Sequence, residues 1–379
     1  MYSRTIESQI KKWLFKNEVL IIYGARQVGK TTLAEEIARS DDPNYKYVDC
    51  DELANRQTLS SQDSNVLKKF VGNHKIVILD EAQRVENIGL NLKILHKNCP
   101  NTQFIATGSS SFDLANKINE PLTGRNIKFE LYPFSLEELS SKNNTNSLNI
   151  QLEQILRFGL YPQVYLLSED DKRIKLRDLS RDYLYRDLLA TEKIKKLSSL
   201  EDVVRYLALC IGQELSFNSI AEKLQIDKGT VERYIALLEQ AFVIFRLKPL
   251  YRNGVKEIRN PFKIYFWDVG LRNAVLDNYL SLSSREDVGR LWENFCVVER
   301  MKINNNIGNY KNYYFWRTKD QKEYDLIEEK DGVFEVFEIK WNEKREVKRH
   351  SEFFDNYKTL QTKAVTINKE NWPEWLIGQ

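Results

Sequence analysis

A glycine-containing stretch at residues 24–31 constrains the fold more than any other part of this 379-residue chain. It reads G-x-x-x-x-G-K-T, follows an apolar run at residues 19–23, and precedes a helical pattern at residues 32–38. Glycine lets such a loop curl with its N–H groups pointing inward, and the following helix turns its positive dipole end toward a bound anion. A strand, a glycine loop and a helix in this order predict a site that cradles phosphates.

Two side chains at the end of this loop carry the expected chemistry. Lys30 is expected to reach the β- and γ-phosphates of a nucleotide, and the Thr31 hydroxyl is expected to ligate Mg²⁺. All fixed positions of the pattern are occupied, which favours nucleotide binding over a chance glycine-rich turn. The residues expected to bind the nucleotide are Gly24, Ala25, Arg26, Gln27, Val28, Gly29, Lys30, Thr31 and Thr32.

Composition excludes few classes of function. The net charge is only +3, so nucleic-acid binding would have to come from local patches. The cysteines at positions 50, 99, 210 and 296 form no C-x-x-C pair, which fits reduced thiols and predicts no cysteine metal site. No apolar run approaches the ~18 residues that a membrane helix needs, and the N-terminus lacks a signal core. We therefore expect a soluble, cytoplasmic protein without a membrane partner.

A second signature lies at residues 76–81, where four apolar residues run into Asp80 and Glu81. A buried strand would deliver Asp80 at its carboxyl end, where it can help hold Mg²⁺ together with Thr31. Glu81 would then be placed to polarise an attacking water. Such a run alone often marks only a strand that meets a solvated turn, but it gains weight about 50 residues after a phosphate loop.

Further strands are expected at residues 45–49, 103–107 and 126–131. Thr107 and Ser109 are candidates to sense a γ-phosphate, although the serines after the strand could instead cap a helix. Arg125 lies where a guanidinium could stabilise charge on a transferring phosphoryl group, or it is a surface arginine in a turn. Apolar strands alternating with helices predict a parallel sheet covered on both faces, with the ligand at the carboxyl ends of its strands.

Together these motifs resemble an AAA+-type ATPase of the bacterial and archaeal group that carries a C-terminal domain of unknown function. The resemblance is carried by the segments at residues 23–31, 79–83, 107–110 and 122–125, and it continues through residues 131–138. It implies a P-loop ATPase core that binds ATP and Mg²⁺. It also implies that Glu81 is the catalytic base and that Arg125 is an arginine finger or sensor, acting in its own subunit or across an oligomer interface.

The middle of the chain predicts a helix-turn-helix. Helices are expected at residues 217–224 and 230–238 with a tight turn between them, and a strand-like run follows at residues 241–247. Lys228, Thr230 and Arg233 are candidates to contact a DNA major groove. Winged helices of this kind also dock proteins, so the partner could be DNA or a protein.

The C-terminal part predicts a second chemical site. A helix at residues 288–298 carries Glu293, and three strands are expected in a meander at residues 313–317, 323–327 and 333–340. Alternation places Glu338 and Lys340 on one strand face, where Asp325 could join them and supply oxygens for Mg²⁺. The segment resembles the restriction-endonuclease-like nuclease fold, and Glu293, Asp325, Glu338 and Lys340 fall on its motif. The alternatives are a solvated sheet face, or a docking surface that keeps the nuclease shape without activity.

The predicted chain is thus α/β: an ATPase core with a P-loop parallel sheet at residues 1–135, a helical connector at 136–195, a winged helix at 196–260 and a nuclease-like α/β domain at 261–379. The leading hypothesis is an ATP-hydrolysing protein that acts on DNA through its C-terminal region. The alternative is a nucleotide-switched, protein-binding scaffold or regulator without nuclease activity. Oligomerisation is left open.

Overall fold

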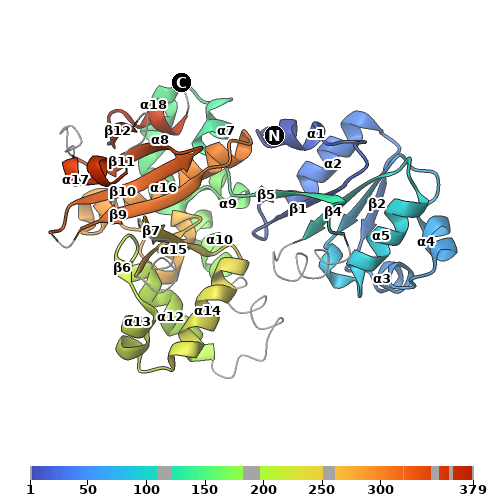
Figure 1. Ribbon diagram of the computed structural model, residues 1–379, viewed down its shortest axis with the longest axis horizontal. Coiled ribbons are helices and arrows are strands. Elements are labelled where there is room, and N and C mark those ends of the chain that lie inside the picture. The colour runs from blue at the N-terminus through green and yellow to red at the C-terminus, as the bar shows by residue number, and fades with distance from the viewer. Residues whose placement is uncertain are drawn as a thin grey trace. The chain divides into compact units, whose positions relative to one another are not determined.

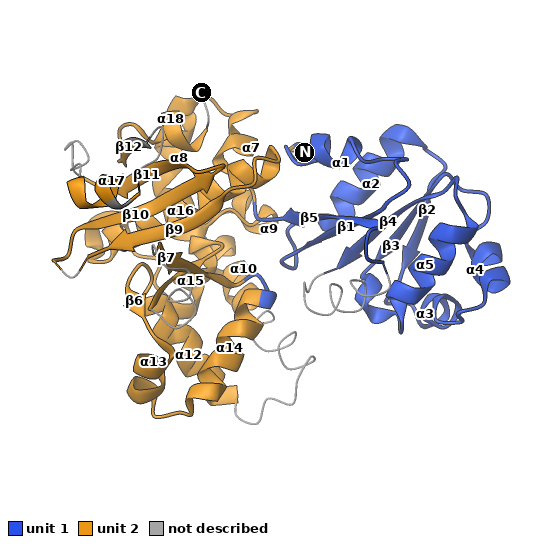
Figure 2. Cartoon of the chain, in the orientation of Figure 1, with its two compact units in different colours: residues 1, 3–133, 240–242 blue, residues 2, 134–239, 243–379 orange. Residues whose placement is uncertain are grey.

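The computed structural model describes residues 2–108, 122–181, 197–250, 261–318, 320–342, 350–357 and 362–377. The chain divides into two compact units, which Figure 2 shows in different colours. The first comprises residues 3–133 and 240–242, and the second comprises residue 2 and residues 134–239 and 243–379. Among the described residues, the helices include none that could cross a bilayer.

The first unit is built on a five-stranded sheet in the order β2-β3-β4-β1-β5, in which every pairing is parallel (Figure 1). Helix α2 packs against β1, β3 and β4. Its elements are α1 (Glu7–Lys11), β1 (Val19–Gly24), α2 (Lys30–Asp41), β2 (Lys46–Asp49), α3 (Leu53–Leu59), α4 (Ser64–Val71), β3 (Ile76–Asp80), η1 (Ala82–Arg84), α5 (Ile88–Asn98), β4 (Gln103–Gly108) and β5 (Asn126–Leu131).

The central strands of this sheet are mostly apolar because both of their faces are covered. Every residue of β3 and of β4 is buried, and β1 is buried except at Tyr23. A parallel sheet flanked by helices requires this pattern, since no side of its inner strands meets water. The predicted α/β fold with a parallel P-loop sheet is confirmed.

The amphipathic pattern of residues 4–16 predicts one helix over this range, but the helix in the structure is shorter. Helix α1 covers only Glu7–Lys11, and i→i+3 turns follow it, such as the bond from the Trp13 N–H to the Ile10 carbonyl. The backbone then takes positive φ at Phe15 and Asn17, which a continuing helix does not allow.

The second unit holds a seven-stranded mixed sheet in the order β12-β11-β10-β9-β7-β8-β6. The expected meander is present, because β10 pairs antiparallel with both β9 and β11. Its elements are α7 (Leu136–Ser140), α8 (Thr145–Phe158), α9 (Pro162–Tyr165), α10 (Glu169–Arg181), α12 (Leu197–Leu209), β6 (Glu214–Leu215), α13 (Phe217–Leu224), α14 (Lys228–Gln240), β7 (Ile244–Pro249), β8 (Phe262–Phe266), α15 (Val269–Leu276), η4 (Leu282–Ser284), α16 (Val288–Asn306), β9 (Asn312–Arg317), β10 (Glu323–Lys330), β11 (Val333–Ile339), α17 (Ser351–Asn356), β12 (Thr362–Ile367) and α18 (Trp372–Leu376).

Helices α13 and α14 follow each other across a short turn, as the sequence predicts. Strand β7 then pairs antiparallel with β8, which lies beyond the predicted boundary at residue 260. Strand β7 also pairs parallel with β9, through Lys248 opposite Tyr314, so this hairpin and the meander belong to one sheet. The boundaries of the four predicted domains remain predictions.

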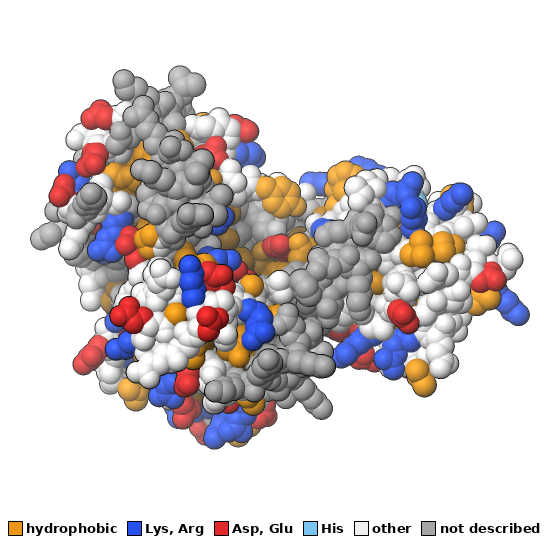
Figure 3. All heavy atoms as spheres, turned by 60° about the horizontal axis from the view of Figure 1, so that its bottom comes forward, with side chains coloured by type: hydrophobic (Ala, Val, Ile, Leu, Met, Phe, Trp, Pro, Cys, Tyr) orange, Lys and Arg blue, Asp and Glu red, His pale blue; other side chains and the backbone are white. Residues whose placement is uncertain are grey.

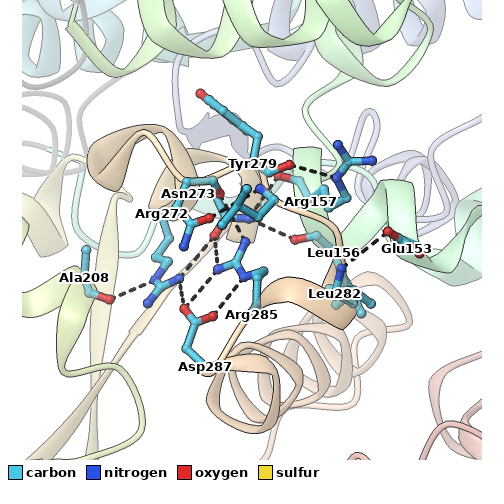
Figure 4. Close-up of polar contacts among 12 residues, drawn as sticks. Glu153, Leu156, Arg157, Ala208, Arg272, Asn273, Tyr279, Leu282, Arg285 and Asp287 are labelled. Atoms are coloured by element: carbon cyan, nitrogen blue, oxygen red, sulfur yellow. Dashed lines mark hydrogen bonds and ion pairs between the residues drawn. The ribbon is translucent and has the colours of Figure 1, made fainter.

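A buried polar network ties four helices of the second unit together (Figure 4). Asp287, just before α16, accepts from Arg272 of α15 at 2.6 Å and from Arg285 at 2.8 and 2.9 Å. Arg272 also donates to the carbonyl of Ala208 in α12, at 2.8 Å. Its neighbour Asn273 donates to two carbonyls at the end of α8, at 3.0 and 2.9 Å. One carboxylate therefore anchors the guanidiniums on which this packing depends.

We expect Asp287→Asn to lower the free energy of unfolding by about 3 kcal/mol at pH 7, since it leaves two guanidiniums without their charged partner. Burial opposes ionisation of Asp287, yet Arg285 and Arg272 hold its pKa below the ordinary range. The stabilisation is therefore fully present above the ordinary aspartate pKa of about 3.9, and it is lost gradually as the pH falls from there through the lowered pKa of the folded protein. Urea denaturation should show the largest difference from the wild type at pH 7 and a smaller one at pH 3, where only part of the stabilisation has been lost. The exposed Asp202→Asn serves as control, and a difference independent of pH would contradict this account.

Candidate nucleotide site and C-terminal charge cluster

The predicted phosphate loop and two other predicted residues meet at the carboxyl ends of β1, β3 and β4. Asp80 is the last residue of β3, and Thr107 lies next to the end of β4. The Thr31 hydroxyl lies 2.9 and 3.0 Å from the two carboxylate oxygens of Asp80. The buried Thr107 hydroxyl donates to the same carboxylate. The fold thus brings together Thr31, Asp80 and Thr107, which are far apart in the sequence.

The glycines of the loop are required by its backbone. A Cβ at Gly24 would lie 2.1 Å from the carbonyl oxygen of Leu131 on the neighbouring strand β5, so no larger residue fits there. Gly29 has φ +96°, in the left-handed region, immediately before α2 begins. Gln27 also has positive φ, at 59°. These conformations produce the tight turn that leads β1 into the N-terminus of α2.

Lys30 is the first residue of α2, and it is only 5% exposed. Its ammonium donates to the carbonyls of Gly24 at 3.1 Å and Ala25 at 2.7 Å, and so lies within the loop. A buried ammonium, a threonine hydroxyl and a carboxylate at a helix N-terminus are the groups that a nucleotide polyphosphate with Mg²⁺ requires. The residues present therefore fit ATP with Mg²⁺. Of the other predicted loop residues, Val28 is buried and Thr32 is exposed.

Glu81 is held in an unusual backbone conformation beside Asp80. Its φ of 51° lies in the left-handed region, which non-glycine residues adopt rarely and at some cost. Its N–H donates to the Thr107 hydroxyl at 3.2 Å, and its carboxylate accepts from the amide of Gln83. Thr107 therefore contacts both Asp80 and Glu81, which links the two acidic residues through one hydroxyl.

The structure does not test the roles predicted for two residues of this site, Ser109 and Arg125. Ser109 lies outside the described residues. Arg125 is exposed in the turn before β5, where its N–H bonds to Leu122 and its carbonyl accepts from Val19, both at 2.9 Å. Their catalytic roles stay predictions.

Sequence reasoning missed three residues that brace this site. The Tyr47 hydroxyl, from β2, donates to Asp80 at 2.9 Å, and burial together with Asp80 raises the pKa of Tyr47. The guanidinium of Arg4 donates to the Val28 carbonyl at 2.8 Å, which fixes the loop from outside. The Gln83 amide donates to the Glu81 carboxylate, and the position of Gln83 two residues after Glu81 was a signal in the sequence. No local sequence pattern points to Arg4 or Tyr47.

A cluster of charged side chains in the second unit contains the predicted nuclease residues. Lys340 lies 3.4 Å from Asp325 and 3.8 Å from Glu338, so these three converge as expected. Glu293, however, pairs with Lys263 of β8, whose ammonium lies 3.0 Å from its carboxylate. Lys263 also reaches Asp325 at 3.7 Å. The remaining contributors, which the sequence did not reveal, are Glu323 and Tyr265.

The residues of this cluster do not fit a divalent metal as they stand. Across the described ranges, no group of three or more His, Cys, Asp or Glu side chains is arranged to hold a metal ion. The ammonium of Lys263 already lies among the carboxylates of Glu293, Glu323 and Asp325. A divalent ion about 4 Å from this ammonium would be repelled by about 8 kcal/mol at an effective dielectric constant near 20. The metal role predicted for Glu293, Asp325, Glu338 and Lys340 therefore requires that Lys263 move.

Comparison with protein families finds three matches along the chain. Residues 16–140 match the AAA domain family. Residues 149–282 and 288–376 match two domains of unknown function, DUF8612 and DUF4143. The winged-helix and nuclease-like interpretations thus stay predictions.

Curated relatives cover most of the chain but have no described function. An uncharacterized protein of Mycobacterium tuberculosis is 27% identical over 340 residues, which cover 89% of this chain and 73% of that protein. An uncharacterized protein of Methanocaldococcus jannaschii is 26% identical over 400 residues, which cover 98% and 87%. The Thermotoga maritima RuvB Holliday junction branch migration motor matches with 17% identity and a TM-score of 0.32, covering 64% of this chain and 88% of that one. By its sequence match, its parallel sheet and its phosphate loop, the first unit is similar to AAA-type P-loop ATPase domains.

Proposed function

We propose that this protein binds ATP with Mg²⁺ and hydrolyses it. The observation that carries this proposal is the contact between Thr31 and Asp80 beside the buried ammonium of Lys30. In this function, residues 24–32 hold the phosphates, while Thr31 and Asp80 hold Mg²⁺. Mg²⁺ would neutralise charge on the phosphate oxygens, and Lys30 would add a second positive charge to the same oxygens.

Hydrolysis requires a group that orients and polarises water, and Glu81 is our candidate. Its backbone is fixed by Thr107 and its carboxylate by Gln83, so its position is defined before the substrate arrives. Thr107 and Ser109 would lie near the γ-phosphate. Arg125 would stabilise charge on the transferring group, from its own subunit or from a neighbour.

Thermal unfolding tests the proposed binding directly. A ligand at about 100 times its Kd stabilises the native state by about 2.7 kcal/mol, which corresponds to a rise of several degrees in melting temperature. We expect ATP with excess Mg²⁺ to raise the melting temperature of the first unit, and ATP with a chelator to raise it less. If saturating ATP and Mg²⁺ leave every thermal unfolding transition of the protein unchanged, nucleotide binding is refuted.

Duplex DNA is our candidate for the molecule on which the ATPase acts. Helices α13 and α14 have the helix-turn-helix order, and α14 exposes Lys228 and Arg233. The sequence after α14 carries basic residues at positions 246, 248, 252, 256 and 259, of which the last three lie outside the described residues. Arg246 is paired with Glu239 at 2.6 Å, which weakens its attraction for phosphates. Basic and acidic side chains are also interspersed on the face drawn in Figure 3.

Fluorescence anisotropy with a labelled duplex tests this candidate at two salt concentrations, with and without ATP. Binding that weakens steeply with salt and is reduced in Arg233→Ala would support contact through α14. Absence of salt-dependent binding would leave the protein-binding scaffold as the better hypothesis.

A further inference from the structure

The charge cluster of the second unit is organised around a lysine that no nuclease motif includes. Lys263 lies on β8 and is 1% exposed. Its ammonium lies 2.6 Å from Glu323, 3.0 Å from Glu293 and 3.7 Å from Asp325. The three donors of an ammonium therefore face carboxylates from α16 and from β10.

The apolar sequence of β8 explains why this lysine is buried. Residues 262–266 read Phe-Lys-Ile-Tyr-Phe, and all of them are buried. Lys263 and Tyr265 share one face because side chains alternate along a strand, and the Tyr265 hydroxyl donates to Glu293 at 2.6 Å. A charge in such a strand is stable only where opposite charges surround it. For Lys263 these opposite charges are the carboxylates of Glu293, Glu323 and Asp325, at 3.0, 2.6 and 3.7 Å from its ammonium.

The carboxylates are likewise already occupied. Asp325 accepts from the N–H of Ile339 at 2.8 Å and from Lys340 at 3.4 Å, in addition to its contact with Lys263. Glu293 accepts from both Lys263 and Tyr265 on one oxygen. An incoming Mg²⁺ needs ligand oxygens at about 2.0–2.1 Å and would have to break these contacts.

We propose that the Lys263 ammonium is the resident cation of this cluster and excludes divalent metal from Glu293 and Asp325. A strand lysine then does permanently what a metal ion would do in a metal-dependent nuclease: it neutralises the carboxylates and holds α16 against β8 and β10. The C-terminal region is accordingly expected not to cut nucleic acid by a metal-dependent route. This inference does not depend on ATP hydrolysis in the first unit.

The test is Mn²⁺ binding by the nucleotide-free full-length protein, followed by electron paramagnetic resonance. In the wild-type protein, no Mn²⁺ site is expected to depend on Asp325, so Asp325→Asn should leave Mn²⁺ binding unchanged. Lys263→Met keeps the apolar stem and removes the charge, so it is expected to bind Mn²⁺ at least about tenfold more tightly than the wild type. Adding Asp325→Asn to Lys263→Met should abolish the new site. Lys248→Met, on the exposed side of the neighbouring strand β7, is the matched control and should behave as the wild type.

Two results would overturn the proposal. The first is a Mn²⁺ site, or nicking of supercoiled plasmid with Mg²⁺ or Mn²⁺, that is present in the wild type and lost in Asp325→Asn. The second is a folded Lys263→Met protein that binds Mn²⁺ no better than the wild type. Should Lys263→Met fail to fold, Lys263→Gln, which keeps a polar group, takes its place, and the wild-type arm remains decisive by itself.

Discussion

A Lys30→Ala variant is expected to lose ATP turnover, with a fall in kcat/KM of about 100-fold or more. Lys30 is buried within the loop, where its ammonium contacts the carbonyls of Gly24 and Ala25. A positive charge shielded from water acts on phosphate oxygens far more strongly than a solvated one, and alanine offers no replacement. Steady-state phosphate release at saturating Mg²⁺ measures the loss.

The matched control is Lys93→Ala, which removes an exposed lysine from α5 in the same unit. It should retain wild-type turnover and the melting-temperature rise with ATP and Mg²⁺, whereas Lys30→Ala should lose both. The melting temperature without nucleotide shows whether Lys30→Ala is folded. Normal turnover in a folded Lys30→Ala protein would mean that this loop is not the site of hydrolysis.

Much of the first unit could be predicted because its signals are local. The run before the loop and the run before Asp80 are apolar throughout, and both became buried parallel strands, β1 and β3. Their loops then had to meet at one edge, since parallel strands end on the same side of a sheet. The contact between Thr31 and Asp80 follows from that geometry alone.

Contacts that depend on tertiary pairing could not be predicted in the same way. Arg4 reaches Val28 across 24 residues and Tyr132 across 128, and no periodicity encodes such a pairing. Lys263 reaches Glu293 only because β8 lies against α16, although a lysine within an apolar strand was a visible signal. The sequence identified Glu293, Asp325 and Glu338 but neither Glu323 nor Lys263, and Lys263 changes what the cluster can do.

Glu81→Gln is expected to separate ATP binding from hydrolysis. Glutamine has nearly the same shape, so the left-handed backbone and the bond from its N–H to Thr107 should persist. It cannot accept a proton from water, and losing a general base costs about 10²–10⁴ in rate. We therefore expect kcat to fall by that factor while the Kd for ATP stays close to that of the wild type. Single-turnover hydrolysis and titration with a fluorescent ATP analogue measure the two quantities.

Two further variants decide whether the effect belongs to the Glu81 carboxylate. Glu86→Gln changes an exposed carboxylate shortly after the same strand and should leave kcat unaltered. Gln83→Ala keeps Glu81 but removes the amide that holds it, so kcat should fall by less than in Glu81→Gln while the Kd is again preserved. If Glu81→Gln hydrolyses ATP at the wild-type rate, another group activates the water. If it loses ATP binding instead, Glu81 supports the loop and is not the base, because a base acts on water and contributes little to holding the phosphates.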